Sequence, residues 1–328
     1  MKKRAGSFFV LFSFLFLFIF PLSINASFIK VTRLLMSTTV TIIAEASVDD
    51  IEAAFERIRE IELMMNHYNP DSQISLLNRK GKLKVSPEVR EVLLRSIYFS
   101  KVTQGAFDVT VGPLVRLWQK MGREGRLPTS EEIETALSLV GYEKIKIEKE
   151  FIFLEKKGML IDLGGIAKGY AVDEAIEVLK KRGVKNALVE AGGDLYCMGE
   201  GSQGKWRIGV QHPRKMGRIV EVIGLKDKAV ATSGDYYRFF FIKGERHSHI
   251  VNPGTGMTVQ ENPMSVSIIA PTCTDADALA TGVFVLGPEK GIKLIESLKD
   301  VEGMIIGKEM KVIKSSGWSE FELTEKDR

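Results

Sequence analysis

The chain has 328 residues, with 46 lysines and arginines against 42 aspartates and glutamates, and 45% of its residues are hydrophobic. This length can hold one large domain or two ordinary ones, and the normal apolar content excludes a disordered or fibrous chain. The formal charge of +4 is weak evidence for a nucleic-acid partner. Two cysteines, Cys197 and Cys273, cannot form a disulfide scaffold. They form at most one bridge, and two free buried thiols are at least as consistent with the sequence.

Residues 1–26 have the pattern of an export signal. Three basic residues precede an apolar run over 8–20, and the segment contains no acidic residue and no cysteine. Thirteen helical residues span only ~20 Å of a ~30 Å bilayer core. The pattern therefore favours a cleaved signal peptide. If the segment is counted from Ala5 to Pro21 it is longer, and a retained membrane anchor stays open. Either way we expect an exported protein, periplasmic or on the outer face of the cytoplasmic membrane. Removing the segment lowers the charge to +1, which removes the hint of a nucleic-acid partner.

The remaining chain predicts a mixture of helices and strands. Apolar periodicity predicts, in chain order, a strand or hairpin over 28–44, helices over 48–65, 87–101 and 130–140, a hairpin from 145–153 and 159–163 that turns at 156–158, a helix over 169–182, strands over 187–196, 206–211, 218–225, 229–232, 236–242 and 266–270, helices over 274–286 and 288–298, and a strand over 304–313. Ser86 is the expected cap of the second helix, Thr129 or Ser130 that of the third, and Gly183 is expected to follow the fourth. Strands and helices do not alternate strictly, which favours an α+β fold.

Two segments could hold a charged ligand. In the first, the sequence DLGGIAKG runs from Asp162 to Gly169 between an apolar stretch and a helix. Its glycines allow close backbone approach, and Lys168 could reach a phosphate. It matches neither standard nucleotide-binding glycine motif, and a plain tight turn explains it equally well. In the second, Asp277 and Thr281 lie four residues apart and hence on one helical face. Their oxygens could hold Mg²⁺, although a capping box with Thr274 as cap is the interpretation that this segment alone favours.

Two further segments could contact a substrate. His247 and His249 are expected on one face of a strand before a glycine-rich turn, where a histidine could act as an acid or base. A solvated strand end is the alternative. Small residues followed by Phe107 and Asp108 could line a planar ligand. A buried turn with Phe107 and Trp118 in the core is the better interpretation of this last segment taken alone.

Taken together, these motifs resemble those of the ApbE-type FAD:protein FMN transferases. The resemblance covers nearly the whole chain after residue 26, in the segments Met36–Thr39, Tyr68–Asn78, Gly105–Trp118, Asp162–Asp173, Ala191–Asp194, Trp206–Pro213, Ser233–Tyr236, His249–Gly256 and Asp275–Val285. It implies one transferase domain over 27–328, with an α+β fold of mixed sheets, flanking helices and a cleft between two lobes. Family members are often lipoproteins, but no cysteine is present here to carry a lipid near the signal.

The resemblance also implies an activity and a set of site residues. FAD would be the substrate, Mg²⁺ the cofactor, and the FMN half would pass to a Thr or Ser hydroxyl of a target flavoprotein while AMP leaves. By match to the family, Asp277, Thr281 and the carbonyl of Gly165 would bind the metal. The implied FAD-binding positions are Met36, Tyr68, Ala106, Phe107, Asp108, Asp162, Lys168 and His249. Of these, Lys168 would also contact phosphate and His249 would be the catalytic base, acting together with Asp277.

Other activities remain open at this stage. The protein could release FMN and AMP to water as a FAD pyrophosphatase, or bind flavin without turnover. In the family, targets are subunits of the Na⁺-translocating NADH:quinone oxidoreductase, of Rnf-type complexes, or of other exported reductases. A membrane contact would arise through an uncleaved N-terminal segment.

Overall fold

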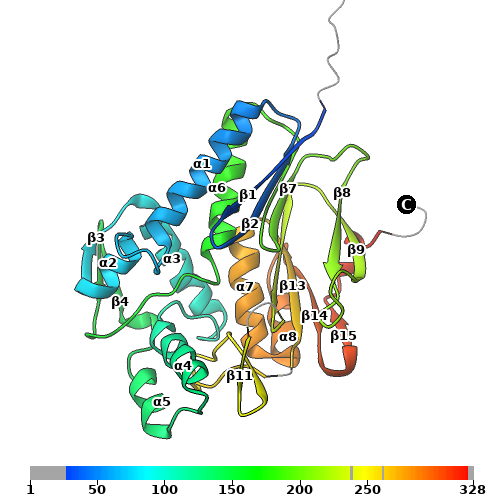
Figure 1. Cartoon of the computed structure of the whole chain (residues 1–328). Coiled ribbons are helices and arrows are strands. Elements are labelled where there is room, and N and C mark those ends of the chain that lie inside the picture. Colours follow the sequence, from blue (N-terminus) through cyan, green and yellow to red (C-terminus); the bar gives the residue numbers. More distant parts are fainter. Residues whose placement is uncertain (1–26, 237–238, 261, 324–328) are drawn as a thin grey trace, which may run out of the picture.

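The computed structural model describes residues 27–236, 239–260 and 262–323, so the predicted signal peptide or anchor over 1–26 lies outside the described residues. The centre of the fold is an eight-stranded antiparallel sheet (Figure 1). Its strands, in spatial order, are β1 (Ile29–Leu35), β2 (Thr38–Ala44), β6 (Ala187–Ala191), β7 (Asp194–Met198), β10 (Lys228–Gly234), β13 (Ser265–Ala270), β14 (Glu302–Ile306) and β15 (Val312–Lys314). Every pair of neighbours is antiparallel.

The central strands of the sheet are buried on both faces. In β13, Val266 and Ile268 belong to the core under the helices, whereas Ile269 belongs to the core on the opposite face. In β6, Val189 and Leu188 divide in the same way. Since successive side chains of a strand point to opposite faces, uniformly apolar strands are what a two-sided sheet requires.

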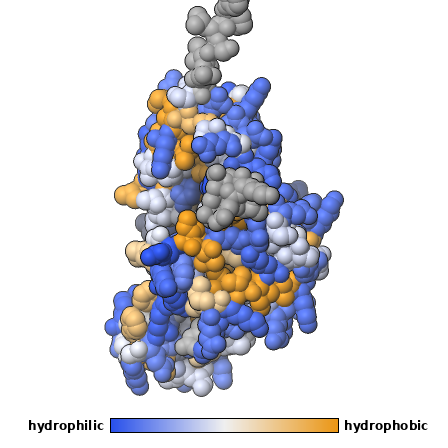
Figure 2. Space-filling model, turned by 90° about the vertical axis from the view of Figure 1, so that its right-hand side faces the viewer, coloured by the Kyte–Doolittle hydropathy of each residue, from blue (hydrophilic) through white to orange (hydrophobic). Residues whose placement is uncertain are grey.

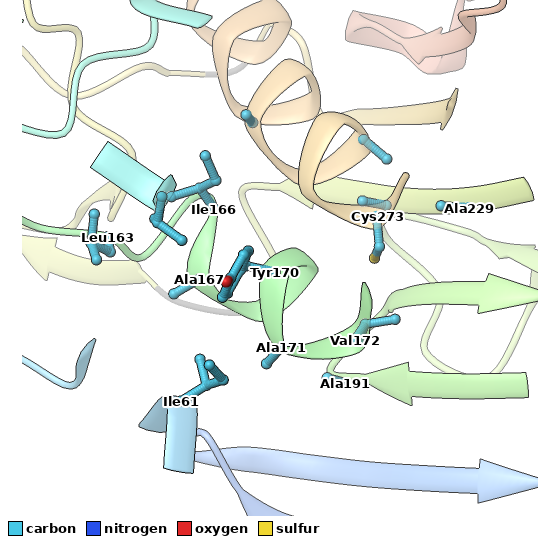
Figure 3. Packing of buried hydrophobic residues seen from close by; sticks show 14 of the residues in the cluster. Ile61, Leu163, Ile166, Ala167, Tyr170, Ala171, Val172, Ala191, Ala229 and Cys273 are labelled. Atoms are coloured by element: carbon cyan, nitrogen blue, oxygen red, sulfur yellow. The ribbon is translucent and has the colours of Figure 1, made fainter. Parts of the chain in front are cut away.

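Helices cover one face of the sheet (Figure 1). They are α1 (Val48–Met65), α6 (Ala167–Lys181), α7 (Cys273–Leu286) and α8 (Pro288–Ser297), with α2 (Gln73–Lys80) and α3 (Pro87–Val102) packed outside them. Figure 3 shows α6 beside α1, with Ala171 toward Ile61 and Val172 toward Ala191 of the sheet. The small side chains of α6 let it pack closely against both its neighbouring helix and the sheet.

The opposite face of the sheet is covered by a hairpin of β8 (Trp206–Gln211) and β9 (Ile219–Leu225) and by the short helix η3 (Trp318–Phe321). Trp206, Ile223 and Trp318 are buried in this second core. Figure 2 shows this side of the molecule, where hydrophobic residues form a band between hydrophilic ones.

The two cysteines lie in different cores. Cys197 is in the core between the sheet and the β8–β9 hairpin, while Cys273 is in the core under the helices. Both are buried and free. The sheet separates the two side chains. Of the two alternatives that the sequence left open, one bridge or two free thiols, the structure has the free thiols.

A second group of elements forms a lobe at one end of the helical layer. It comprises α4 (Gly112–Glu124), α5 (Ser130–Leu137) and the hairpin β11 (Phe239–Ile242) and β12 (Glu245–Ser248). Leu114, Trp118 and Ile242 are among the residues of its small core. A separate three-stranded sheet contains β3 (Lys82–Lys84), β5 (Phe151–Leu154) and β4 (Ile145–Glu148). The short helices η1 (Tyr142–Lys144) and η2 (Lys308–Met310) complete the described elements. The predicted α+β class is confirmed.

Most predicted elements are present, and their caps explain why. Helix α1 has the predicted bounds, and Ser86 and Pro87 begin α3 as expected. Thr129 rather than Ser130 caps α5, since its side chain and that of Glu132 each accept a hydrogen bond from the other's backbone N–H. Gly183, with φ of +85°, follows α6. Among the described residues, no helix is both long and apolar enough to span a membrane.

Three predicted strands are wrong in their extent. The single strand over 187–196 is two strands, because Gly192 and Gly193 have positive φ and turn the chain back. The strand over 304–313 is likewise divided into β14 and β15. The hairpin that begins at residue 145 turns at Lys149 and Glu150, so the segment 159–163 is not its second strand. Helices α2 and α4 were missed.

Candidate active site at the junction of α6 and α7

Helices α6 and α7 meet at Gly169 and the first turn of α7. A Cβ at Gly169 would lie 2.3 Å from the carbonyl oxygen of Cys273, so only glycine allows this approach. Asp173 of α6 accepts hydrogen bonds from the backbone N–H groups of Cys273 and Thr274, both at 2.8 Å. Burial raises the pKa of Asp173 to about 6, although these hydrogen bonds oppose the shift.

The favoured capping interpretation of Asp277 is wrong. The cap of α7 is Thr272, whose hydroxyl accepts from the backbone N–H of Asp275 at 3.2 Å. Asp277 therefore stands two residues further into the helix than a capping box would place it, and its side chain is only 4% exposed. A buried carboxylate without a capping role needs another explanation.

Asp277 belongs to a buried cluster of charges. The ammonium group of Lys168 lies 3.3 and 3.4 Å from its two carboxylate oxygens, and the backbone N–H of Gly169 donates to it at 3.1 Å. On its other side Lys168 forms an ion pair with Asp194, which also accepts from the backbone N–H of Thr232. Two carboxyl groups thus share one ammonium group in a buried place.

The pKa values of this cluster follow from burial and from these neighbours. Burial, reinforced by the charge of Asp277, raises the pKa of Asp194 to about 7. Burial disfavours the charged form of Lys168, but the two carboxylates outweigh it and raise the pKa of Lys168. The lysine is therefore a fixed positive charge at neutral pH.

Oxygen atoms suited to a hard cation surround Asp277. Thr281 lies one turn further along α7, and its hydroxyl is 3.2 Å from that of Ser233 at the end of β10. A Cβ at Gly165 would lie 2.8 Å from the Thr281 hydroxyl, so the backbone of Gly165 closes the same small space. Among the described residues, no group of three or more His, Cys, Asp or Glu side chains could hold a metal. A sparse set of one carboxylate, one hydroxyl and a backbone carbonyl fits Mg²⁺, which usually keeps water and takes phosphate oxygens.

Tyr68 and Asp162 line a cavity of about 390 Å³ between α2 and α4. Tyr68 is 65% exposed, its ring lies against that of His67, and its hydroxyl accepts from Gln119 at 3.3 Å. One carboxylate oxygen of Asp162 lies 3.6 Å from Nδ1 of His67. Arg79 and Arg116 also line this cavity, so an exposed ring and two cations are available to a ligand with a flat base and phosphates.

The other predicted FAD-binding residues lie deeper or at the edge. Phe107 and Ala106 are buried, and the ring of Phe107 packs near Gly165. Both oxygens of Asp108 accept hydrogen bonds within the protein, from Thr110 and from the backbone N–H of Tyr142. The structure therefore gives the Asp108 side chain a role in fixing this turn.

Met36 occupies the turn between β1 and β2. Its φ is +55°, and Thr38, two residues later, packs closely against Gly192 in the turn between β6 and β7. Asp194 begins β7 directly after that turn. Met36 thus lies at the same end of the sheet as the Lys168 cluster.

The two histidines have different environments, contrary to the prediction that they share a face. His247 is buried, stacks on Trp118 with 5.3 Å between ring centroids, and its Nδ1 lies 3.2 Å from the hydroxyl of Thr258. Burial lowers its pKa. His249 is exposed, because β12 ends at Ser248 and the chain changes direction. Only His249 is accessible to a substrate.

Sequence reasoning assigned no role to Asp194, Ser233 or Asp173. Each lies in a segment that carries the family resemblance, and that was the available signal. Their chemistry became evident only when the sheet brought β7 and β10 beside α6 and α7.

Residues 36–305 match the model of the ApbE family. The chain belongs to the ApbE family. It is 37% identical over 272 residues to the FAD:protein FMN transferase of Haemophilus influenzae, a match that covers 79% of this chain and 78% of that protein. It is 31% identical over 244 residues to the Escherichia coli K12 protein of the same name, covering 71% of this chain and 69% of the relative.

Solved ApbE structures have the same fold. The flavin transferase ApbE from Vibrio cholerae superposes with a TM-score of 0.81 at 32% identity, covering 90% of this chain and 99% of the other. The ApbE protein from Thermotoga maritima superposes with a TM-score of 0.83 at 33% identity, covering 91% and 100%. The predicted ApbE-like fold is confirmed.

Proposed function

We propose that this protein transfers the FMN half of FAD to a Thr or Ser hydroxyl of a target flavoprotein, in a Mg²⁺-dependent reaction that releases AMP. The observation that carries the proposal is the buried Asp277 with Lys168 at 3.3 Å, in a chain of the ApbE family. The names of its relatives and the oxygen-rich surroundings of Thr281 support it.

Attack on a pyrophosphate requires positioning and charge neutralisation more than covalent participation of the protein. Asp277, Thr281 and the Gly165 carbonyl would hold Mg²⁺, which when bound would neutralise the phosphate oxygens and orient them. Lys168 is already fixed by Asp194 and would contact the same phosphates.

The acceptor hydroxyl oxygen bonds to the phosphorus of the FMN half, and the bond from that phosphorus to the oxygen of AMP breaks. We assign to the exposed His249 the role of base that takes the hydroxyl proton, which would contribute about 10²- to 10⁴-fold.

The localisation and the partner are part of the same proposal. The apolar segment over 8–20 supports export, with the enzyme in the periplasm or on the outer face of the cytoplasmic membrane. If the segment is retained, it would be the membrane contact. A subunit of an Rnf-type or Na⁺-translocating NADH:quinone oxidoreductase complex, or of another exported reductase, would be the target.

Incubation with FAD, Mg²⁺ and a candidate target domain tests the proposal. A fluorescent flavin band on the denatured target, with one AMP released per flavin attached, is the expected result. Release of AMP without such a band would instead identify a FAD pyrophosphatase.

The variant Asp277→Ala separates catalysis from flavin binding. We expect it to abolish AMP release while FAD still binds, and to cost more activity than His249→Ala. Asp275→Ala is the matched control, because Asp275 lies on the same helix but pairs with Arg95. If FAD binds but even the unaltered protein releases no AMP, the protein is a flavin-binding protein without turnover.

A further inference from the structure

Three contacts between the segment 165–173, which includes the start of α6, and helix α7 follow one register. Each step moves four residues back along the first segment and four residues forward along α7. The pairs, in order, are Asp173 with Cys273, Gly169 with Asp277, and Gly165 with Thr281. Because a step of four residues returns to the same face of a helix, one face of α7 carries all three partners. The last pair belongs to the proposed Mg²⁺ site.

Asp173 makes the first of these contacts with both of its carboxylate oxygens. Oδ1 accepts from the backbone N–H of Cys273 at 2.8 Å, and Oδ2 accepts from the N–H and the hydroxyl of Thr274 at 2.8 and 2.6 Å. Thr272, the cap of α7, accepts from the next N–H, that of Asp275, at 3.2 Å. These two side chains thus satisfy the first N–H groups of α7, which have no acceptor within the helix. The start of α7 is therefore attached to one residue of α6.

The other two contacts restrain the register less. Glycine has no side chain, so Gly165 and Gly169 permit close approach but grip little. The N–H of Gly169 makes one hydrogen bond, of 3.1 Å, to Asp277. Small side chains of α7 that are buried in the same core offer few protruding groups to resist sliding, and these are Ala276, Ala278 and Ala280.

We propose that Asp173 is a positioning residue for the metal site, because it sets the register of α7 against α6 and so holds both side-chain ligands opposite Gly165. The inference rests on the proposed function, since it concerns the residues expected to hold Mg²⁺. A slide of α7 by one residue moves its groups about 1.5 Å along the axis. Oxygen ligands lie about 2.1 Å from Mg²⁺ in a nearly ideal octahedron, so such a shift would separate the Thr281 hydroxyl from the Gly165 carbonyl. Asp173 would act through α7 and needs no contact with the metal.

The test variant is Asp173→Asn, which keeps the shape of the side chain. An amide offers one oxygen, and its NH₂ group would face a backbone N–H of α7, so two donors meet where a donor met an acceptor. Glu174→Gln is the matched control, because it makes the same chemical change at the next position of α6. Glu174 accepts at 2.9 Å from Arg57 of α1 rather than from α7. The control should therefore weaken the packing of α6 and leave the start of α7 in place.

Melting temperatures of the full-length protein measure metal binding separately from activity. The samples contain FAD and a series of Mg²⁺ concentrations but no acceptor, and each variant is compared with its own metal-free sample, which removes a general loss of stability. Measurement at about pH 8 keeps Asp173 ionised, because burial raises its pKa only to about 6.

We expect Asp173→Asn to need about ten- to hundredfold more Mg²⁺ for the same rise in melting temperature, and Glu174→Gln to need the same Mg²⁺ as the unaltered protein. The affinity for FAD without Mg²⁺ should be equal in all three proteins, because the residues that line the cavity around Tyr68 lie outside α7. An unchanged Mg²⁺ requirement in Asp173→Asn would overturn the proposal. So would an equal increase in Glu174→Gln, which would assign the effect to a general loosening of α6.

A second pair of variants decides the question if Asp173→Asn does not fold. Thr274→Val removes only the hydroxyl contact with Asp173, at 2.6 Å, and Thr274→Ser keeps it. A higher Mg²⁺ requirement in Thr274→Val than in Thr274→Ser supports the proposal, and equal requirements overturn it.

A failure of the proposed function gives a different result. In that case Mg²⁺ does not raise the melting temperature of the unaltered protein with FAD, and the positioning proposal falls with the metal site. A normal Mg²⁺ response of the unaltered protein, with the same requirement in every variant, leaves the transferase function intact and removes only the role of Asp173.

Discussion

The contact between Gly169 and the start of α7 provides the sharpest test of how this site is built. In Gly169→Ala, the added methyl carbon would lie 2.3 Å from the carbonyl oxygen of Cys273 and 2.6 Å from its carbonyl carbon. Both are backbone atoms, so no side-chain rotation relieves the overlap. An ordinary contact needs at least 3.4 Å, and the two helices must therefore separate by about 1 Å.

Three effects set the change in the free energy of unfolding. Overpacking costs about 1–3 kcal/mol, and weakening the 3.1 Å hydrogen bond from Gly169 N–H to buried Asp277 costs about 1.5–3 kcal/mol. Replacing glycine by alanine within a helix returns about 1 kcal/mol. The net expectation is a loss of about 1.5–5 kcal/mol. Because the same shift moves Lys168 away from Asp277, we expect the transfer rate to fall about 10²-fold.

Urea denaturation and the rate of AMP release measure both effects. Gly201→Ala is the control, since its added carbon would make only ordinary contacts, with the ring of Trp206 at 3.4 Å and the carbonyl oxygen of Gly204 at 3.6 Å. It should change stability by less than about 0.5 kcal/mol and leave the rate unaltered. Wild-type stability together with wild-type activity in Gly169→Ala would refute the reasoning.

Three further outcomes are expected. Thr281→Val removes only the hydroxyl and should raise the Mg²⁺ concentration needed for half-maximal AMP release about tenfold. Thr281→Ser keeps the hydroxyl and should stay close to wild type. An unchanged Mg²⁺ dependence in Thr281→Val would exclude Thr281 as a ligand. Burial raises the pKa of both Cys197 and Cys273, so a thiol reagent at about pH 8 should label neither in the native protein and both after denaturation; a disulfide would contradict this. The hydrogen bond from Arg126 lowers the pKa of Glu132 from 4.5 to about 2, so this carboxylate stabilises the fold above its unfolded pKa and ceases to do so as the pH falls through the folded one. The stability difference between wild type and Glu132→Gln should therefore narrow as the pH falls from about 4.5 to about 2, as followed by thermal melts; a constant difference would refute it.

Local patterns predicted the elements whose stability depends on nearby residues. Helix α1 has an unbroken apolar stripe and a capping serine, so its bounds could be predicted from the sequence. The strand over 187–196 could not be divided correctly, because the turn at Gly192 and Gly193 depends on pairing with β2 and β10. Helix α4 was missed because Val111 gives it no side-chain cap and its buried residues face a separate small core.

The site residues likewise divide into those that local sequence could indicate and those that depend on tertiary contacts. Lys168 and Asp277 could be singled out from their own segments, but the segment around Asp277 alone favoured a cap. The correct cap, Thr272, follows from where α7 begins, and this depends on the contacts that Asp173 makes from another helix. Asp194 received no role, because a lone aspartate after two glycines is ordinary until its partner is known.

By itself the sequence determined which segments carry the candidate functional groups. These are a basic and apolar leader, a glycine-rich turn before α6, an Asp–Thr pair on one face of α7, and a histidine before a turn. Only the tertiary structure decided which of these groups meet. Lys168 and Asp277 are 109 residues apart in the chain, and their contact depends on a glycine at the helix crossing and on a sheet that places Asp194 beneath them. The physical reason is that local propensity acts over a few residues, whereas burying two carboxylates around one ammonium group requires the packing of the whole domain.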